Sequence, residues 1–155
     1  MQTFTDKLIE QIKFKKSVLC VGLDPQIKHL PKNLKKEFDL AFKNKLEATA
    51  ECVLEFNKIV IDKVKNHAAC VKLQNAFFEQ YGHWGAYAFE KSIQYAKEKD
   101  LLVISDVKRG DGGDTAKAYA NAHLNKVDLI DDQSIQAPFQ TDAITLNINI
   151  GRSCL

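Results

Sequence analysis

The stretch that decides the fold is Leu101-Leu102-Val103-Ile104-Ser105-Asp106-Val107-Lys108-Arg109-Gly110-Asp111-Gly112-Gly113-Asp114-Thr115. It begins with four apolar residues, a run typical of a strand that is buried on both faces of a parallel sheet. Side chains two apart on a strand share a face, so Asp106 and Lys108 are expected to point the same way, with Asp111 on the following loop. Alternating charges at the carboxyl end of a parallel strand lie where α/β folds carry chemistry.

The triplet Asp106-Val107-Lys108 has two interpretations. A solvated surface ion pair beside a glycine-rich turn is common and contributes little. The buried strand in front of the triplet favours the other interpretation, because charges at the mouth of a core strand are partly desolvated and strongly coupled. We therefore treat this stretch as the candidate site.

Two other predicted strands also end in polar residues. The segment 17–23 is a short apolar run before Asp24 and Pro25, where Asp24 is either a site residue at the strand end or a turn residue. The segment 68–73 carries Lys72, with Gln74 two residues further on. A lysine within an apolar run needs a carboxylate partner, because an unpaired buried charge is costly. Asp106 is the best partner in the chain.

The rest of the chain alternates with these strands. Apolar spacing predicts helices over 3–16, 40–66 and 84–99, a further helix that begins with Asp114 as its N-cap, and a fourth strand over 142–147. The segment 29–39 is predicted as a loop or broken helix, and the segment 131–140 as a loop. This alternation indicates an α/β fold with parallel strands joined by right-handed crossovers. Four aromatic residues after the second strand are expected to pack in the core, namely Phe77, Phe78, Tyr81 and Trp84.

Composition excludes several classes of protein. The 155 residues suffice for one domain, and a net charge of +2 gives no support for nucleic-acid or membrane binding. Cys20, Cys52 and Cys70 lie in apolar runs and are expected to be buried free thiols, and no cysteine stands at metal-ligand spacing. No signal peptide and no apolar span of 18 residues or more is visible, so a soluble cytoplasmic protein is expected.

Four separated segments, taken together, resemble orotidine 5′-phosphate decarboxylase, and the resemblance covers essentially the whole chain. The second segment is similar to the longer bacterial subfamily. The segments are Val21-Gly22-Leu23-Asp24-Pro25, Lys72-Leu73-Gln74-Asn75-Ala76-Phe77-Phe78-Glu79, Asp106-Val107-Lys108-Arg109-Gly110-Asp111-x-Gly113-x-Thr115 and Asp142-Ala143-Ile144-Thr145-Leu146-Asn147.

The resemblance implies a (β/α)8 TIM barrel, of which residues 1–155 would form the N-terminal part of a single domain. About four of the eight parallel strands are then present, as a truncated barrel. The family's phosphate-gripping loops would lie beyond Leu155. Two departures from the family pattern are Gly112, where isoleucine is usual, and Ile148-Asn149, where Pro-Tyr is usual.

The resemblance also implies a reaction, the loss of CO2 from orotidine 5′-monophosphate to give UMP in pyrimidine biosynthesis, with no metal and no cofactor. By analogy Lys108 is the acid, Asp106 faces the substrate carboxylate, and Lys72 and Asp111 complete the charged chain. In the family the equivalent of Asp111 comes from the other subunit of a homodimer with a shared active site.

Three further residues are implied as substrate-binding. Thr115 would reach the ribose together with Asp111, Asp24 would bind a ribose hydroxyl, and Gln74 would lie near the ribose. Two alternatives remain open. One is a metal-dependent sugar-phosphate lyase or synthase of the same suprafamily, against which the segments around Asp24 and Lys72 argue. The other is a non-functional gene fragment.

Overall fold

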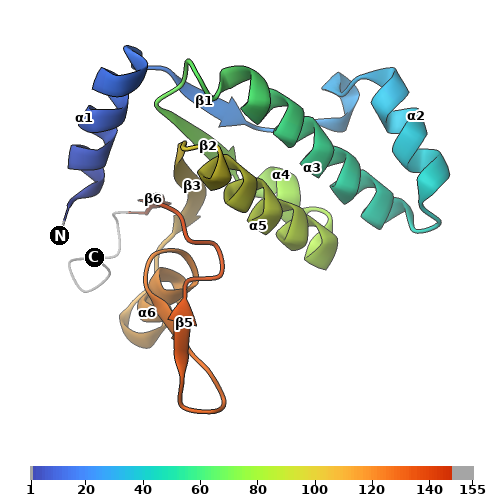
Figure 1. Cartoon of the computed structure of the whole chain (residues 1–155). Helices are drawn as coiled ribbons and strands as arrows, with labels where there is room; N and C mark the ends of the chain where they lie inside the picture. Colours follow the sequence, from blue (N-terminus) through green and yellow to red (C-terminus); the bar gives the residue numbers. More distant parts are fainter. Residues whose placement is uncertain (1, 148–155) are drawn as a thin grey trace.

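A parallel sheet of four strands forms the centre of the computed structural model, which describes residues 2–147 (Figure 1). The strands are β1 (Cys20–Leu23), β2 (Cys70–Gln74), β3 (Leu102–Arg109) and β6 (Ala143–Leu146), in the spatial order β1-β2-β3-β6. All three pairings are parallel. The predicted α/β class with about four parallel strands is therefore confirmed.

Helices precede and connect these strands. They are α1 (Phe4–Lys15), the 3-10 turn η1 (Ile27–His29), α2 (Lys32–Ala41), α3 (Lys45–Val64), α4 (Ala76–Glu79), α5 (Gly82–Glu98) and α6 (Gly113–His123). In Figure 1, α3 and α5 lie side by side over the sheet. Their fully buried residues, such as Val53, Ile61 and Ile93, join Val71 and Val103 of the inner strands in one core. This core fixes the two central strands, whose carboxyl ends carry the predicted charges.

Two helix starts show how the chain sets its boundaries. The Thr3 hydroxyl accepts the Asp6 amide hydrogen at 3.2 Å, and the Asp6 carboxylate accepts the Thr3 amide hydrogen in return, which forms a capping box for α1. The predicted N-cap Asp114 is wrong, because Gly112 is the N-cap of α6 and Asp114 lies in its first turn. The chain turns into α6 through Gly113, whose φ of 53° suits glycine.

Two predicted segments need refinement. The segment 29–39, predicted as a loop or broken helix, is a broken helix: η1 ends at His29, and α2 follows after Pro31, its N-cap, with Leu34 and Phe38 packed on the core. The single helix predicted over 40–66 is divided, since Phe42 is extended and Asn44 caps α3 through its side-chain oxygen.

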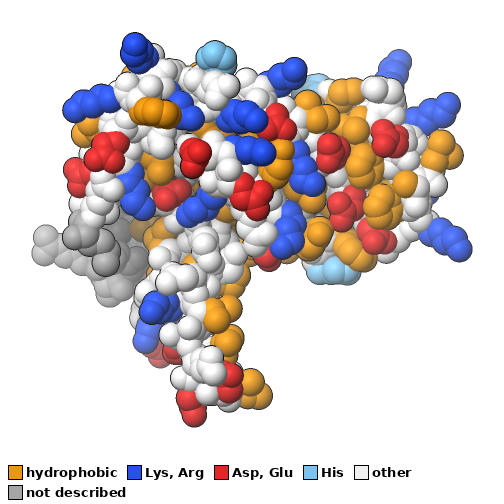
Figure 2. All heavy atoms as spheres, viewed as in Figure 1, with side chains coloured by type: hydrophobic (Ala, Val, Ile, Leu, Met, Phe, Trp, Pro, Cys, Tyr) orange, Lys and Arg blue, Asp and Glu red, His pale blue; other side chains and the backbone are white. Residues whose placement is uncertain are grey.

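The predicted loop over 131–140 contains a strand of a small hairpin. Strands β4 (Lys126–Asp128) and β5 (Ser134–Gln136) pair antiparallel and project from the body as an arm. Figure 2 shows apolar side chains exposed along this arm, where Leu129, Ile130 and Ile135 are exposed.

The three cysteines within the described range differ in burial. Cys52 and Cys70 are buried as predicted, whereas Cys20 is exposed, because β1 is an outer strand of the sheet. Aromatic packing is confirmed, since Phe78 is fully buried and Phe77, Tyr81 and Trp84 pack against the core. Within residues 2–147, no helix is long and apolar enough to cross a membrane.

Candidate active site

The carboxyl ends of three adjacent strands bring the predicted charges together. Lys72 Nζ lies 3.1 Å from Asp106 Oδ2 and 3.6 Å from Asp24 Oδ1. Lys108 Nζ lies 2.6 Å from Asp106 Oδ1. Asp106 is thus paired with a lysine on each carboxylate oxygen. The side-chain pairing of Lys72 with Asp106, predicted from the cost of burying a lysine, is observed.

The Asp106 carboxylate accepts four hydrogen bonds. Oδ1 accepts from Lys108 Nζ and from the Thr145 hydroxyl, at 2.6 and 2.8 Å. Oδ2 accepts from Lys72 Nζ and from Gln74 Nε2, at 3.1 and 2.8 Å. Two carboxylate oxygens offer about four lone-pair sites, so these donors saturate the group. Such saturation fixes the orientation of the carboxylate and favours its ionised form.

Burial and hydrogen bonding act on Asp106 in opposite directions. Asp106 is 7% exposed, and its burial alone would raise the pKa of the carboxyl. The hydrogen bonds from Lys108, Thr145 and Lys72, with the charge of Lys72, outweigh this effect and lower the pKa from 3.8 to about 2. Asp106 is therefore a buried carboxylate that stays ionised at neutral pH.

The backbone of Lys108 is left-handed, with φ of 47°. Its amide hydrogen is donated to Thr145 Oγ1 at 3.0 Å. The pairing of β3 with β6 shifts register between Ser105 and Arg109, so Lys108 stands in a bulge of the ladder. Non-glycine residues in this conformation cluster at functional sites. The Lys108 side chain is 64% exposed, which leaves its ammonium group accessible from outside.

An open hollow of about 530 Å³ lies at this end of the sheet. Its lining residues are Asp106, Lys108, Thr145, Leu146 and Asn147. The hollow is large enough for a small-molecule ligand. It places the buried carboxylate and the exposed ammonium group on one cavity wall.

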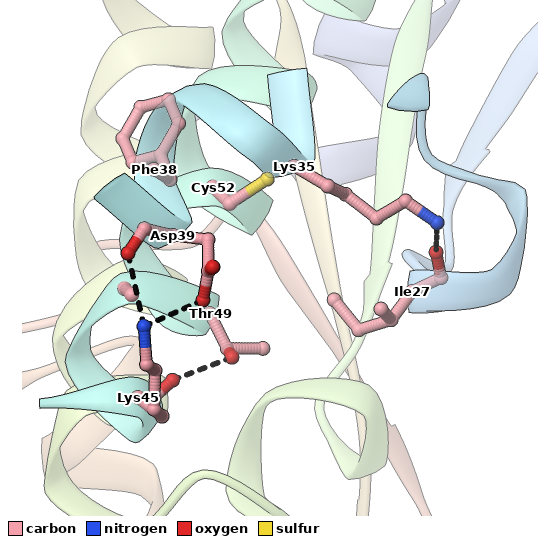
Figure 3. A pocket seen from close by; sticks show the side chains of 8 residues that line it. Ile27, Lys35, Phe38, Asp39, Lys45, Thr49 and Cys52 are labelled. Atoms are coloured by element: carbon pink, nitrogen blue, oxygen red, sulfur yellow. Dashed lines mark hydrogen bonds and ion pairs between the residues drawn. The ribbon is translucent and has the colours of Figure 1, made fainter. Parts of the chain in front are cut away.

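A second hollow, of about 410 Å³, lies between α2 and α3 (Figure 3). Its polar groups bind one another: Lys45 Nζ lies 2.6 Å from Asp39 Oδ1, and Lys35 Nζ donates to the Ile27 carbonyl at 3.2 Å. Burial raises the pKa of the Cys52 thiol on its wall. The charges of this hollow are thus used within the fold, in contrast to the strand-end network.

Two predicted site residues are not part of the network. Asp111 is exposed and accepts the amide hydrogen of Gly112 at 2.8 Å. Thr115 is exposed in the first turns of α6. The departure at Gly112 lies at the open start of α6, with no atom within 4 Å of where a Cβ would stand. The departure at Ile148-Asn149 lies outside the described residues.

Thr145 is the site residue that sequence reasoning missed. It lies in the quoted segment Asp142–Asn147, but a threonine in a strand is ordinary and gave no signal of its own. Its partners become visible only when β6 is placed beside β3. Within residues 2–147, no group of three or more histidine, cysteine or acidic side chains is arranged to hold a metal ion.

Comparisons with known proteins concern the chain as a whole. Residues 17–153 match the model of the orotidine 5′-phosphate decarboxylase / HUMPS family. An orotidine 5′-phosphate decarboxylase of Caldicellulosiruptor saccharolyticus is 40% identical over 152 residues, which cover 98% of this chain and 49% of that protein. One of Clostridium perfringens is 36% identical over 146 residues, 94% of this chain and 44% of that protein.

Solved structures also match nearly the whole of this chain to about half of their own length. The crystal structure of a putative orotidine 5′-phosphate decarboxylase from Streptomyces avermitilis superposes with a TM-score of 0.73 at 29% identity, over 99% of this chain and 47% of that chain. One from Toxoplasma gondii gives a TM-score of 0.72 at 30% identity, over 99% of this chain and 43% of that chain. The chain spans about half the length of the curated relatives it matches.

Proposed function

Because the chain belongs to the orotidine 5′-phosphate decarboxylase / HUMPS family, we propose that it carries the charged site of an enzyme that converts orotidine 5′-monophosphate to UMP. One observation carries the proposal: Asp106, buried and ionised, lies between Lys72 and Lys108 at the mouth of a parallel sheet. A carbanion reaction needs such a fixed pattern of charges. No observation in the described part of the chain favours a sugar-phosphate lyase or synthase.

Lys108 is the acid in the proposed reaction. The bond between C6 and the carboxylate carbon breaks, CO2 leaves, and the electron pair stays on C6. The Lys108 ammonium group stabilises this developing charge and then donates a proton to C6, which yields UMP and a neutral amine that solvent reprotonates. Its exposed Nζ beside the hollow supports this role.

Asp106 and Lys72 set the field around the reacting atom. Asp106 faces the substrate carboxylate, and the proximity of two anions raises the energy of the bound substrate. Lys72 bridges Asp106 and Asp24, so it holds both carboxylates in place.

The remaining parts of the proposal concern the substrate and a second subunit. Asp24 and Gln74 bind the ribose from β1 and β2, and the enzyme is a cytoplasmic homodimer. Asp111 and Thr115 act in the site of the neighbouring subunit. Their exposure beside the mouth of the sheet supports this assignment, since neither side chain is used to hold its own subunit's network.

The test uses a hybrid barrel, in which this chain replaces the matching segment of the Caldicellulosiruptor saccharolyticus decarboxylase. We expect single-turnover formation of UMP by the hybrid, and a loss of about 10²-fold or more in Lys108→Ala. Lys63→Ala, at an exposed position of α3, is the matched control and should leave turnover unchanged. A loss below about tenfold in Lys108→Ala would show that Lys108 is not the acid.

A further inference from the structure

Thr145 makes two hydrogen bonds whose directions are fixed by chemistry. Its Oγ1 lies 2.8 Å from Asp106 Oδ1 and 3.0 Å from the Lys108 amide nitrogen. An ionised carboxylate can only accept, and a backbone amide can only donate. The single hydroxyl proton is therefore donated to Asp106, while a lone pair accepts from Lys108. One side chain thus joins the carboxylate to the backbone of the lysine.

The β-bulge explains why Lys108 needs this contact. Ser105 is paired with Ile144, and Arg109 with Leu146, so Thr145 stands alone opposite the three residues 106–108. The extra residues take the Lys108 amide out of the regular ladder, and the left-handed φ of 47° is costly for a lysine. The Thr145 hydroxyl supplies the acceptor that the ladder does not.

The Lys108 side chain meets the same carboxylate oxygen as Thr145. Its Nζ lies 2.6 Å from Asp106 Oδ1, which also accepts from the Thr145 hydroxyl at 2.8 Å. One ring of contacts therefore joins the Thr145 hydroxyl, the Asp106 carboxylate oxygen, and the ammonium group and amide of Lys108.

We propose that Thr145 is a positioning residue, whose hydroxyl holds Asp106 and the left-handed backbone of Lys108 in the arrangement that presents the ammonium group to C6. This inference rests on the proposed function. The methyl group of Thr145 has no part in this positioning. Valine, which has the same shape without the hydroxyl, should therefore not hold Lys108 in place, whereas serine, which keeps the hydroxyl, should.

The test compares Thr145→Val with Thr145→Ser in the hybrid barrel. Thr141→Val is the control of the same substitution type: Thr141 is buried, Thr145 is half-buried, and the Thr141 hydroxyl donates to the backbone carbonyl of His123, away from the network. We expect Thr145→Val to lower kcat about 10- to 100-fold with little change in KM, because the proton donor is displaced while substrate contacts remain. Thr145→Ser and Thr141→Val should stay close to the unaltered hybrid.

A second readout does not depend on turnover. The carboxyl 13C resonance of Asp106, identified with Asp106→Asn, reports its titration. Loss of the Thr145 donor should raise the pKa of Asp106 in Thr145→Val, and Thr145→Ser should restore it, because a hydrogen bond to the ionised form favours that form. The acid limb of the kcat profile should move to higher pH in the same variant.

The outcomes separate the two proposals. Equal kcat and equal Asp106 titration in Thr145→Val and Thr141→Val would overturn the positioning role, as would a Thr145→Ser variant as slow as Thr145→Val. If the unaltered hybrid forms no UMP, the proposed function fails, and the titration alone decides the inference. A pKa of Asp106 that is raised in Thr145→Val and restored in Thr145→Ser then supports the positioning role of the hydroxyl. An unchanged pKa of Asp106 overturns that role.

Discussion

Replacing Asp106 by asparagine shows whether the charged network stabilises the fold. The folded protein lowers the pKa of Asp106 from 3.8 to about 2, although its burial acts in the other direction. A shift of this size corresponds to about 2 kcal/mol in favour of the ionised group in the folded state. In Asp106→Asn, Lys72 and Lys108 face a neutral amide, and among residues 2–147 only Asp24, 3.6 Å from Lys72, remains as an acidic partner. We expect a loss of about 2 kcal/mol of unfolding free energy at pH 7, as an upper value, because solvent screens the exposed Lys108.

Urea unfolding of the hybrid barrel measures this loss. The stabilisation by a carboxylate whose pKa is lowered on folding is complete above 3.8 and disappears as pH falls through about 2, so the two proteins should converge in that range. Asp128→Asn is the control, because Asp128 is exposed in β4, away from the network, and its change should stay within about 0.5 kcal/mol. An Asp106→Asn variant as stable as the parent at pH 7 would refute the reasoning and show that the network is held together at a cost to the fold.

Two further predictions concern titration and assembly. Burial first, and then the charge of Arg109, lower the pKa of His123 from 6.5 to about 4. The unfolded chain therefore takes up a proton at His123 as pH falls through 6.5, whereas the folded state does not. The free energy of unfolding should fall by about 2 kcal/mol between pH 7 and 5 for this reason. In urea titrations, His123→Phe should remove this part of the dependence on pH. The 155-residue chain alone should self-associate on size exclusion and form no UMP, because β1 and β6 leave open sheet edges and the segment before β1 exposes Val18 and Leu19. A two-fold dimer with the turnover of the hybrid would contradict this.

Local patterns predicted most of the fold. The central strands are near-continuous apolar runs, and both are buried, as the parallel-sheet interpretation requires. The predictions were less exact where the pattern was weak. Helix α2 buries one residue, Leu34, so its periodicity is hard to see among lysines. Strand β5 has three residues, all exposed, and therefore no alternation that a sequence could display.

The charged part of the site was predictable for a different reason. A lysine in an apolar strand is so costly unpaired that Lys72 required a carboxylate, and only a neighbouring strand end could supply one. That argument does not depend on the register of the paired strands, because the carboxyl ends of parallel strands meet at the same edge of the sheet. It therefore favours Asp106 as the partner without the ladder pairing of Gln74 with Asp106.

The role of Thr145 depends on register and could not be found in this way. Strand periodicity assumes that each residue of β3 faces one residue of β6, and under that assumption Thr145 is an ordinary strand threonine. The bulge between Ser105 and Arg109 breaks the assumption, because it sets three residues against one. A hydroxyl that is unremarkable in a regular ladder then becomes the acceptor for the Lys108 amide and a donor to Asp106. The charged residues of the candidate site are thus visible in the sequence, whereas Thr145, which contacts two of them, becomes visible only with the irregular pairing of β3 and β6.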